Sequence, residues 1–192
     1  MTKKRAVIMM GSPRIKGNSS TLAQQVAEGI KASGAEVESF FLHGMEIRPC
    51  TACEVCLENS SKDCIIEDDM KILYPKLRQA DALVIASPIY WFTVSAQTKL
   101  FIDRCYALEG PEGNALKGKR IGIILTYADP DPFSSGAVNA LRTFQDTFNY
   151  IGAVITGMIY GSAEEAGEIR ANKDLMRQAY HLGQRIVAGS EE

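Results

Sequence analysis

The stretch Val7-Ile8-Met9-Met10-Gly11-Ser12-Pro13-Arg14-Ile15-Lys16-Gly17-Asn18-Ser19-Ser20 changes character at Gly11. The apolar run 6–10 before it is long enough for a buried strand, whereas residues 11–19 are almost entirely Gly, Ser, Pro, Asn and cations. From Thr21 onward, apolar residues recur every four positions, which is typical of a helix. This stretch therefore predicts a strand, a polar loop and a helix start.

Such a junction is suited to an anion, because a helix N-terminus leaves backbone N–H groups unpaired and carries about half a positive charge. Side chains that can donate hydrogen bonds are concentrated here. They are the hydroxyls of Ser12, Ser19, Ser20 and Thr21, the amide of Asn18 and the guanidinium of Arg14. We therefore predict that this loop binds a phosphate, although an ordinary capped turn would have a similar composition.

Two common phosphate loops do not fit. A P-loop would need a lysine where Asn18 stands, and the Rossmann pattern G-x-G-x-x-G is missing. The pattern Gly-Ser-x-Arg-x-x-Gly-Asn-Ser after a first strand instead resembles the FMN-phosphate loop of the flavodoxin-like NADPH-dependent FMN reductases. The resemblance implies that Ser12, Arg14, Asn18, Ser19 and Ser20 bind the phosphate of FMN.

The rest of the chain alternates between strand and helix patterns. We predict further strands at 35–42, 82–86, 120–126 and 153–160, and helices at 70–77, 93–106, 138–148 and 164–187, with Thr93 as an N-cap and Lys99, Asp103 and Arg104 on a polar helix face. This alternation predicts an α/β fold with a doubly wound, five-stranded parallel sheet and helices on both faces. The flavodoxin-like strand order is 2-1-3-4-5, and residues 1–192 form one domain with a cysteine-rich insertion at about 43–67.

In such sheets, ligands bind beyond the carboxyl ends of the strands, where the strand order reverses. Three polar loops follow strands at this edge, at 11–20, 87–93 and 127–136. We therefore expect these loops to lie together and to form one ligand site.

The second loop, Pro88-Ile89-Tyr90-Trp91-Phe92, also resembles the FMN reductases, and the match continues through Lys99, Phe101, Asp103 and Arg104. The resemblance implies that this loop lies along the isoalloxazine ring, with Ser135 and Gly136 of the third loop near its far edge. The alternative is that these aromatic residues belong to the core or to a subunit interface.

Cysteines are the most distinctive feature of the insertion. Four of the five cysteines in the chain, Cys50, Cys53, Cys56 and Cys64, lie within 15 residues. Their spacing is close to that of bacterial ferredoxins, which hold an iron–sulfur cluster. Together with the flavin loops, it resembles the iron–sulfur flavoproteins and implies a [4Fe–4S] cluster. Zinc and free redox-active thiols remain alternatives, and Cys105 is predicted to be a small buried apolar residue.

Composition excludes other classes of function. The net charge of −2 offers no basic surface for nucleic acid. The longest apolar runs, such as 82–86 and 121–125, are far shorter than the roughly 20 residues of a membrane-spanning helix. The apolar run after Lys3, Lys4 and Arg5 is also too short for a signal peptide, so we expect a cytoplasmic protein with reduced cysteines.

These patterns predict an FMN-dependent oxidoreductase that passes electrons from NAD(P)H or a reduced carrier to a quinone or another small acceptor. No catalytic side chain is assigned, because flavin carries the chemistry itself. One alternative is an iron–sulfur flavoprotein with FMN and a [4Fe–4S] cluster that exchanges electrons with ferredoxin, and another is a flavin-bound regulatory module. The resemblance also implies a homodimer or a homotetramer.

Overall fold

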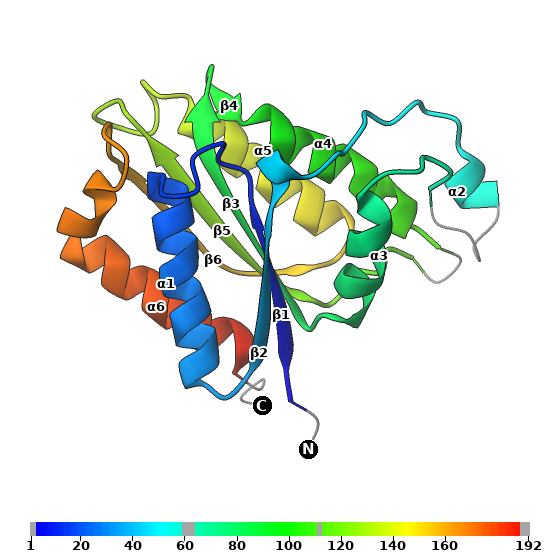
Figure 1. The fold of residues 1–192 in the computed structure, drawn as a ribbon, viewed down its shortest axis with the longest axis horizontal. Helices are drawn as coiled ribbons and strands as arrows, with labels where there is room; N and C mark the ends of the chain where they lie inside the picture. Colours follow the sequence, from blue (N-terminus) through cyan, green and yellow to red (C-terminus); the bar gives the residue numbers. More distant parts are fainter. Residues whose placement is uncertain (1–2, 59–63, 111–112, 189–192) are drawn as a thin grey trace.

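The apolar runs of the sequence pair into one twisted sheet that crosses the middle of the molecule (Figure 1). This computed structural model describes residues 3–58, 64–110 and 113–188. The parallel strands, in sheet order, are β2 (Glu36–Phe41), β1 (Arg5–Met10), β3 (Ala82–Tyr90), β5 (Arg120–Tyr127) and β6 (Val154–Ser162). The predicted fold class and strand order are confirmed, and a short sixth strand, β4 (Thr93–Val94), pairs antiparallel with β3.

Helices cover both faces of the sheet. They are α1 (Asn18–Ala32), α2 (Val55–Glu58), α3 (Met70–Gln79), α4 (Ala96–Arg104), α5 (Ala137–Tyr150) and α6 (Lys173–Val187), with short 3₁₀ turns η1 (Leu42–Gly44), η2 (Cys105–Leu108) and η3 (Glu168–Ala171). α1 and α6 lie on one side of the sheet, and α3, α4 and α5 lie on the other (Figure 1). Among the described residues, no helix is long and apolar enough to cross a bilayer.

Successive side chains of the central strands point to opposite faces of the sheet, so the protein has two hydrophobic cores. Ile8 and Val84 point toward α1 and α6, whereas Met9 and Ile85 point toward α3, α4 and α5, and all four are at most 1% exposed. A strand buried on both faces must be apolar at nearly every position, which explains the continuous apolar runs of β1 and β3.

Two predicted boundaries are wrong at the end of β3. Residues 87–90 continue the strand instead of forming a loop, and Thr93 lies in β4, so that Ser95 caps α4 by accepting the Thr98 N–H through its Oγ. Pro88 has no N–H group to donate to a neighbouring strand. The strand tolerates it because β1 pairs with β3 only as far as Ala86, so no β1 residue lies beside Pro88 to accept a hydrogen bond.

The last helix is also shorter than predicted. Residues 164–187 do not form one helix, because Gly167 adopts a left-handed φ of 85° and Asn172 then starts α6. The Asn172 side chain accepts a hydrogen bond from the Leu175 N–H at 3.0 Å, as an N-cap does.

Candidate functional site

The first loop is organised around one backbone carbonyl. The Arg14 oxygen accepts hydrogen bonds from Ser12 Oγ at 3.1 Å, from the Gly17 N–H at 2.9 Å and from Ser20 Oγ at 3.2 Å. Ser12 Oγ also accepts the Arg14 N–H at 3.0 Å. Ser12 and Ser20 therefore shape the loop from within, and the Arg14 side chain stays exposed beside it.

The start of α1 has the character of an anion site. Its N-cap is Gly17, which has no side chain to bind the first N–H groups, and its first turn contains no acidic residue. Ser19 and Thr21 are 1% and 3% exposed, and their hydroxyl oxygens have no hydrogen-bond partner among the described residues. Buried hydroxyls are costly without a partner, so this helix start leaves unpaired polar groups for which an anion would supply acceptors.

Asn18 has a different structural role. Its amide nitrogen donates to the carbonyls of Ala163 and Glu165, and its amide oxygen accepts the N–H groups of Gly167 and Ile169, all at 2.9–3.3 Å. These four bonds use the full capacity of the amide. The Asn18 side chain thus braces the segment after β6 against α1, and only its backbone N–H remains available to an anion.

A buried hydroxyl network joins the first loop to α4. Ser95 Oγ donates to the Gly11 carbonyl at 2.7 Å and lies 2.9 Å from Thr98 Oγ1. Any Cβ at Gly11 would lie 1.8 Å from Thr98 Oγ1, so this close approach requires glycine. Ser87 Oγ accepts the Ser95 N–H at 3.0 Å and so extends the network to β3.

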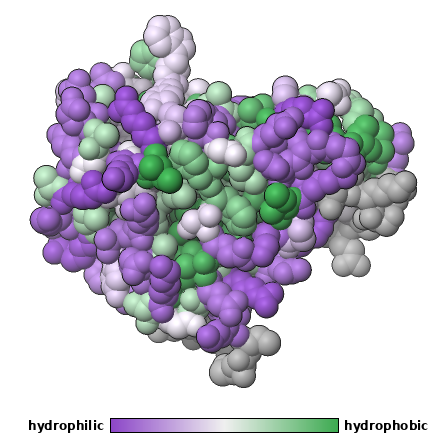
Figure 2. All heavy atoms as spheres, in the orientation of Figure 1, coloured by the Kyte–Doolittle hydropathy of each residue, from purple (hydrophilic) through white to green (hydrophobic). Residues whose placement is uncertain are grey.

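The second loop is a tight hairpin. Tyr90 pairs with Thr93, so Trp91 and Phe92 alone form the turn, with φ values of 49° and 67°. Positive φ at both central residues defines a type I′ turn, which normally contains Asn-Gly. Two bulky aromatics in this conformation are strained, and such strain is concentrated at functional sites. The hairpin projects at the top of Figure 1 and forms the protrusion at the top of the space-filling view in Figure 2, and Trp91 is 92% exposed.

The third loop contacts this hairpin. Gly136 has a φ of 75°, and a Cβ there would lie 2.6 Å from the Phe92 side chain. Asn139 Nδ2 donates to the Phe92 carbonyl at 3.2 Å, and Ser135 Oγ accepts the Ala137 N–H at 3.2 Å. The structure therefore brings the three predicted loops together at one edge of the sheet.

The cysteine-rich segment is closed at its base by two carboxylates. Asp69 Oδ2 accepts the Glu46 N–H at 2.8 Å, and Asp68 Oδ2 accepts the Arg48 N–H at 2.9 Å. Asp68 also binds the Arg104 guanidinium, and these two side chains are 0% and 1% exposed. The prediction of Arg104 on a polar helix face is therefore wrong, since it is buried as the partner of Asp68.

The four clustered cysteines do not form a metal site in this arrangement. Cys50 and Cys53 are exposed, Cys56 is half-buried and Cys64 is buried. Burial, and then the neighbouring Cys64, Cys53 and Cys50 thiols, raise the pKa of Cys56. Within residues 3–58, 64–110 and 113–188, however, no group of three or more His, Cys, Asp or Glu side chains is placed to hold a metal ion.

Cys105 differs from this group. It begins η2 and is half-buried, and desolvation raises its pKa to about 12, so its thiol stays protonated. It is less buried than the sequence predicted, because it lines a cavity that the sequence did not predict.

Comparisons with known proteins identify the family of this chain. The family model described as NADPH-dependent FMN reductase matches residues 4–168. An iron-sulfur flavoprotein of Archaeoglobus fulgidus is 33% identical over 97% of this chain and 80% of the relative. An iron-sulfur flavoprotein of Methanosarcina thermophila is 31% identical over 77% of this chain and 74% of the relative.

Solved structures share the fold. An NAD(P)H:quinone oxidoreductase from Methanothermobacter marburgensis aligns with a TM-score of 0.76 and 17% identity over 99% of this chain and 100% of its own. An FMN-dependent NADH-azoreductase from Bacillus anthracis, solved with FMN, aligns with a TM-score of 0.70 and 12% identity over 96% and 100% of the two chains. At these identities the similarity supports the fold alone.

Proposed function

Because the chain belongs to the NADPH-dependent FMN reductase family, we propose that it binds FMN at the carboxyl edge of its sheet and passes electrons from NAD(P)H to a quinone or another small acceptor. The start of α1 carries this proposal, because the buried Ser19 and Thr21 hydroxyls have no partner among the described residues. The isoalloxazine ring supplies the redox chemistry, so no protein acid or base is required.

Both backbone groups and side chains would bind the phosphate in this proposal. The backbone N–H groups at the start of α1 and the Ser19 hydroxyl would donate to the phosphate oxygens, and the exposed Arg14 guanidinium would pair with their charge. Ser12 and Ser20 would contribute indirectly, because their hydroxyls donate to the Arg14 carbonyl and so fix the shape of the loop. Asn18 fixes the loop against the segment after β6.

The ring would lie against the β3–β4 hairpin. In this proposal, one side of the ring is lined by Pro88, Ile89, Tyr90, Trp91 and Phe92. The third loop approaches the ring with Ser135 and Gly136. Backbone N–H groups of a rigid turn can stabilise the negative charge that a reduced ring carries. Tyr90 and Phe92 remain 43% and 54% exposed, so both present ring surface for stacking.

We expect Arg14→Ala combined with Ser19→Ala to weaken FMN binding by roughly 100-fold, since hydrogen bonds to charged groups contribute about 1.5–3 kcal/mol each. Titration of the apoprotein with FMN, followed by the quenching of flavin fluorescence, measures this. Arg177→Ala with Ser39→Ala removes the same residue types from α6 and β2 and serves as the matched control. Equal affinities for the two double variants would place the phosphate elsewhere.

The electron donor is tested with the same FMN-loaded protein. Anaerobic stopped-flow mixing with NADPH or NADH should reduce the bound flavin faster than free FMN at the same nucleotide concentration. A rate no faster than that of free FMN would exclude the nicotinamide reaction and would leave a reduced protein carrier as the donor.

A second candidate function is an iron–sulfur flavoprotein linked to ferredoxin. Four cysteines within 15 residues favour it, and the relatives described above carry that name. The chemistry of four thiolates suits a [4Fe–4S] cluster, but their arrangement in the described residues does not fit one. Cluster binding would therefore require the segment that carries Cys50, Cys53 and Cys56 to rearrange.

Iron and acid-labile sulfide per FMN, measured on protein purified without oxygen, decide between the two functions. The second candidate predicts about four of each per flavin, with loss of both in Cys53→Ser and retention in the control Cys105→Ser. FMN without iron or sulfide would favour the simple reductase and assign the four thiols to zinc or to thiol chemistry.

We also propose that the protein forms a homodimer or a homotetramer, with the hairpin at an interface. Trp91 is 92% exposed and Phe133 of the third loop is 78% exposed, and large apolar side chains with so much exposure are characteristic of contact surfaces. The cytoplasmic location expected from the sequence stays a prediction.

A further inference from the structure

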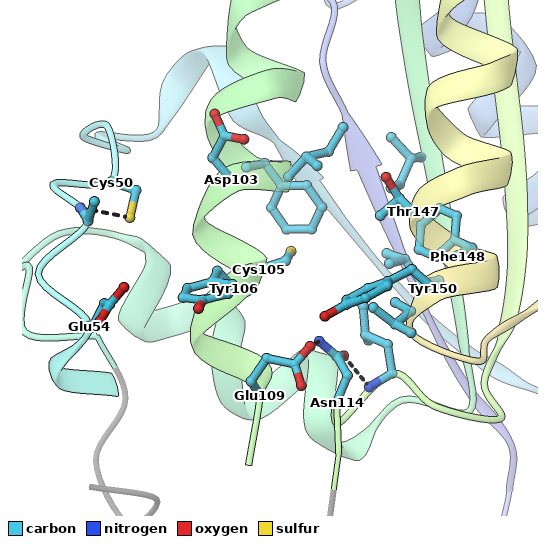
Figure 3. A pocket seen from close by; sticks show the side chains of 17 residues that line it. Cys50, Glu54, Asp103, Cys105, Tyr106, Glu109, Asn114, Thr147, Phe148 and Tyr150 are labelled. Carbon is cyan, nitrogen blue, oxygen red and sulfur yellow. Dashed lines mark hydrogen bonds between the residues drawn. The ribbon is translucent and has the colours of Figure 1, made fainter. Parts of the chain in front are cut away.

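A cavity of about 510 Å³ lies away from the proposed flavin site. It opens between η2, the end of α5 and the cysteine-rich segment, on the face of the sheet that carries α3 and α4 (Figure 3). Its inner wall is apolar, with Leu83, Ile85, Phe101, Leu116 and Phe148 buried there. A mainly apolar cavity of this size is typical of small-molecule sites.

Two tyrosines stand at the opening. Tyr106 belongs to η2 and Tyr150 ends α5, and Figure 3 shows them on opposite sides of the gap, with Cys105 between them. Tyr106 is 47% exposed and Tyr150 is 86% exposed. An aromatic ring attracts a cation to its face, because the ring quadrupole is negative there.

The charged groups at this cavity are carboxylates. Glu54, Asp103 and Glu109 line it, and its described lining includes no Lys or Arg. Asp103 pairs with Lys99 at 2.5 Å, and Glu109 accepts a hydrogen bond from Asn114 at 2.9 Å, whereas Glu54 has no ion-pair partner in the described ranges. Desolvation, and then Glu54, raise the pKa of Tyr106, which is consistent with negative charge at the opening.

Backbone strain marks the same wall. Ala52 and Glu54 have positive φ values of 52° and 59°, and both line the cavity. Outside glycine, positive φ in the described residues occurs only here and in the Trp91-Phe92 turn. Strained backbone conformations are concentrated at ligand clamps and active sites. The strain at Ala52 and Glu54 is therefore consistent with a ligand site at this wall.

We propose that this cavity binds an organic cation with a flat apolar body, which enters between Tyr106 and Tyr150 and places its ammonium group near Glu54 and Glu109. The apolar wall would bury the body, and the two rings and the carboxylates would compensate for the charge. An anion of the same shape would be repelled. None of the residues proposed to bind the flavin lines this cavity, whereas Cys50, Ala52 and Glu54 of the cysteine-rich segment do.

The test uses FMN-loaded protein in reducing buffer, so that the flavin site is already filled. The probes are (1-naphthylmethyl)trimethylammonium and the matched anion 1-naphthylmethanesulfonate, each titrated by calorimetry. Tyr150→Ser and Glu109→Gln change the opening of the cavity, whereas Tyr180→Ser and Glu28→Gln change the same residue types on α6 and α1, across the sheet. Far-ultraviolet circular dichroism confirms that each variant is folded.

We expect one cation to bind per chain, with negligible binding of the anion. Tyr150→Ser and Glu109→Gln should each weaken the binding of the cation by roughly fivefold, as expected for one cation–aromatic contact or one exposed charge pair. Both control variants should bind like the wild-type protein. Equal binding of cation and anion, unchanged binding in both opening variants, or no binding at all, as when a second copy covers the opening, would overturn the proposal.

Discussion

Asp68→Asn is expected to lower the free energy of unfolding by about 3–5 kcal/mol, because it leaves a buried guanidinium without its counter-charge. The Asp68 and Arg104 side chains are 0% and 1% exposed. Arg104 Nη1 also donates to the Arg48 carbonyl at 2.8 Å, and Nη2 donates to Asp68 Oδ1 at 3.2 Å. Chemical denaturation followed by circular dichroism measures the loss.

The effect extends to the cysteine-rich segment. Asp68 accepts N–H groups from Arg48, at the start of that segment, and from Met70, at the start of α3. Tyr74 of α3 donates to the Arg104 carbonyl at 3.1 Å. Because these bonds close the base of the segment, the variant should also expose the buried Cys64, and a thiol reagent should label that residue faster than in the wild-type protein.

This stabilisation depends on pH in a defined direction. Burial alone would raise the pKa of Asp68, but the Arg104 guanidinium and the N–H groups of Arg48 and Met70 lower it overall. A carboxyl whose pKa is lower in the folded state than in the unfolded chain, where it is about 3.9, stabilises the fold above that value. The contribution is lost as the pH falls through the folded-state pKa, and Asp68→Asn should remove this part of the acid sensitivity.

Two further variants isolate the buried pair. Asp146→Asn breaks the ion pair with Arg142, whose side chains are 58% and 76% exposed, and should cost less than about 1 kcal/mol. Combining Asp68→Asn with Arg104→Met removes both charges, so the double variant should lose less stability than the sum of the single variants. Additive losses would show that the two charges do not stabilise one another.

Much of the fold could be predicted from the sequence. The apolar runs of β1, β3 and β5 are buried on both faces, so their burial required continuous apolar sequence, and the alternation with helices indicated a parallel sheet. The strand order was expected from the flavodoxin-like pattern. The three loops at the carboxyl edge follow from that order. The anion character of the first loop was also visible, because Gly, Ser and Arg precede a helical pattern.

The remaining features depend on contacts that are distant in sequence. Asn18 resembles a phosphate ligand in its motif, but its amide binds residues 163–169, which no local pattern indicates. Arg104 has the spacing of an exposed helix position, yet Asp68 lies 36 residues away and accepts it in the core. The cavity behind Tyr106 was missed because its wall combines η2, α5 and the cysteine-rich segment.

The hairpin contradicts local preference at the place where we propose that the flavin binds. Asn-Gly is the preferred pair for a type I′ turn, whereas this chain places Trp91 and Phe92 there at φ values of 49° and 67°. Each strained residue costs about 1–3 kcal/mol. Replacing the pair by Trp91→Asn and Phe92→Gly should therefore raise the free energy of unfolding by about 2 kcal/mol, after allowing for the lost contact between Phe92 and Gly136.

The stabilised variant should bind its cofactor less well. If Trp91 and Phe92 border the isoalloxazine ring as proposed, their removal should weaken FMN binding by roughly 30-fold, because two aromatic contacts of about 1 kcal/mol each are lost. If the hairpin also contacts a second copy, the mass measured by light scattering should fall. Phe133→Asn is a control for stability alone, because Phe133 belongs to the same proposed contact surface but is 78% exposed without a positive φ, so the free energy of unfolding should change by less than about 0.5 kcal/mol.

Stability and flavin affinity separate the possible roles of this turn. Higher stability with weaker FMN binding would mean that the two aromatic side chains are retained for the flavin at a cost to the fold. Unchanged stability would contradict the strain argument, since the same hydrogen-bonded pair of Tyr90 and Thr93 closes both turns. Higher stability with unchanged affinity would move the ring away from the hairpin and leave the exposed Trp91 to the contact between subunits.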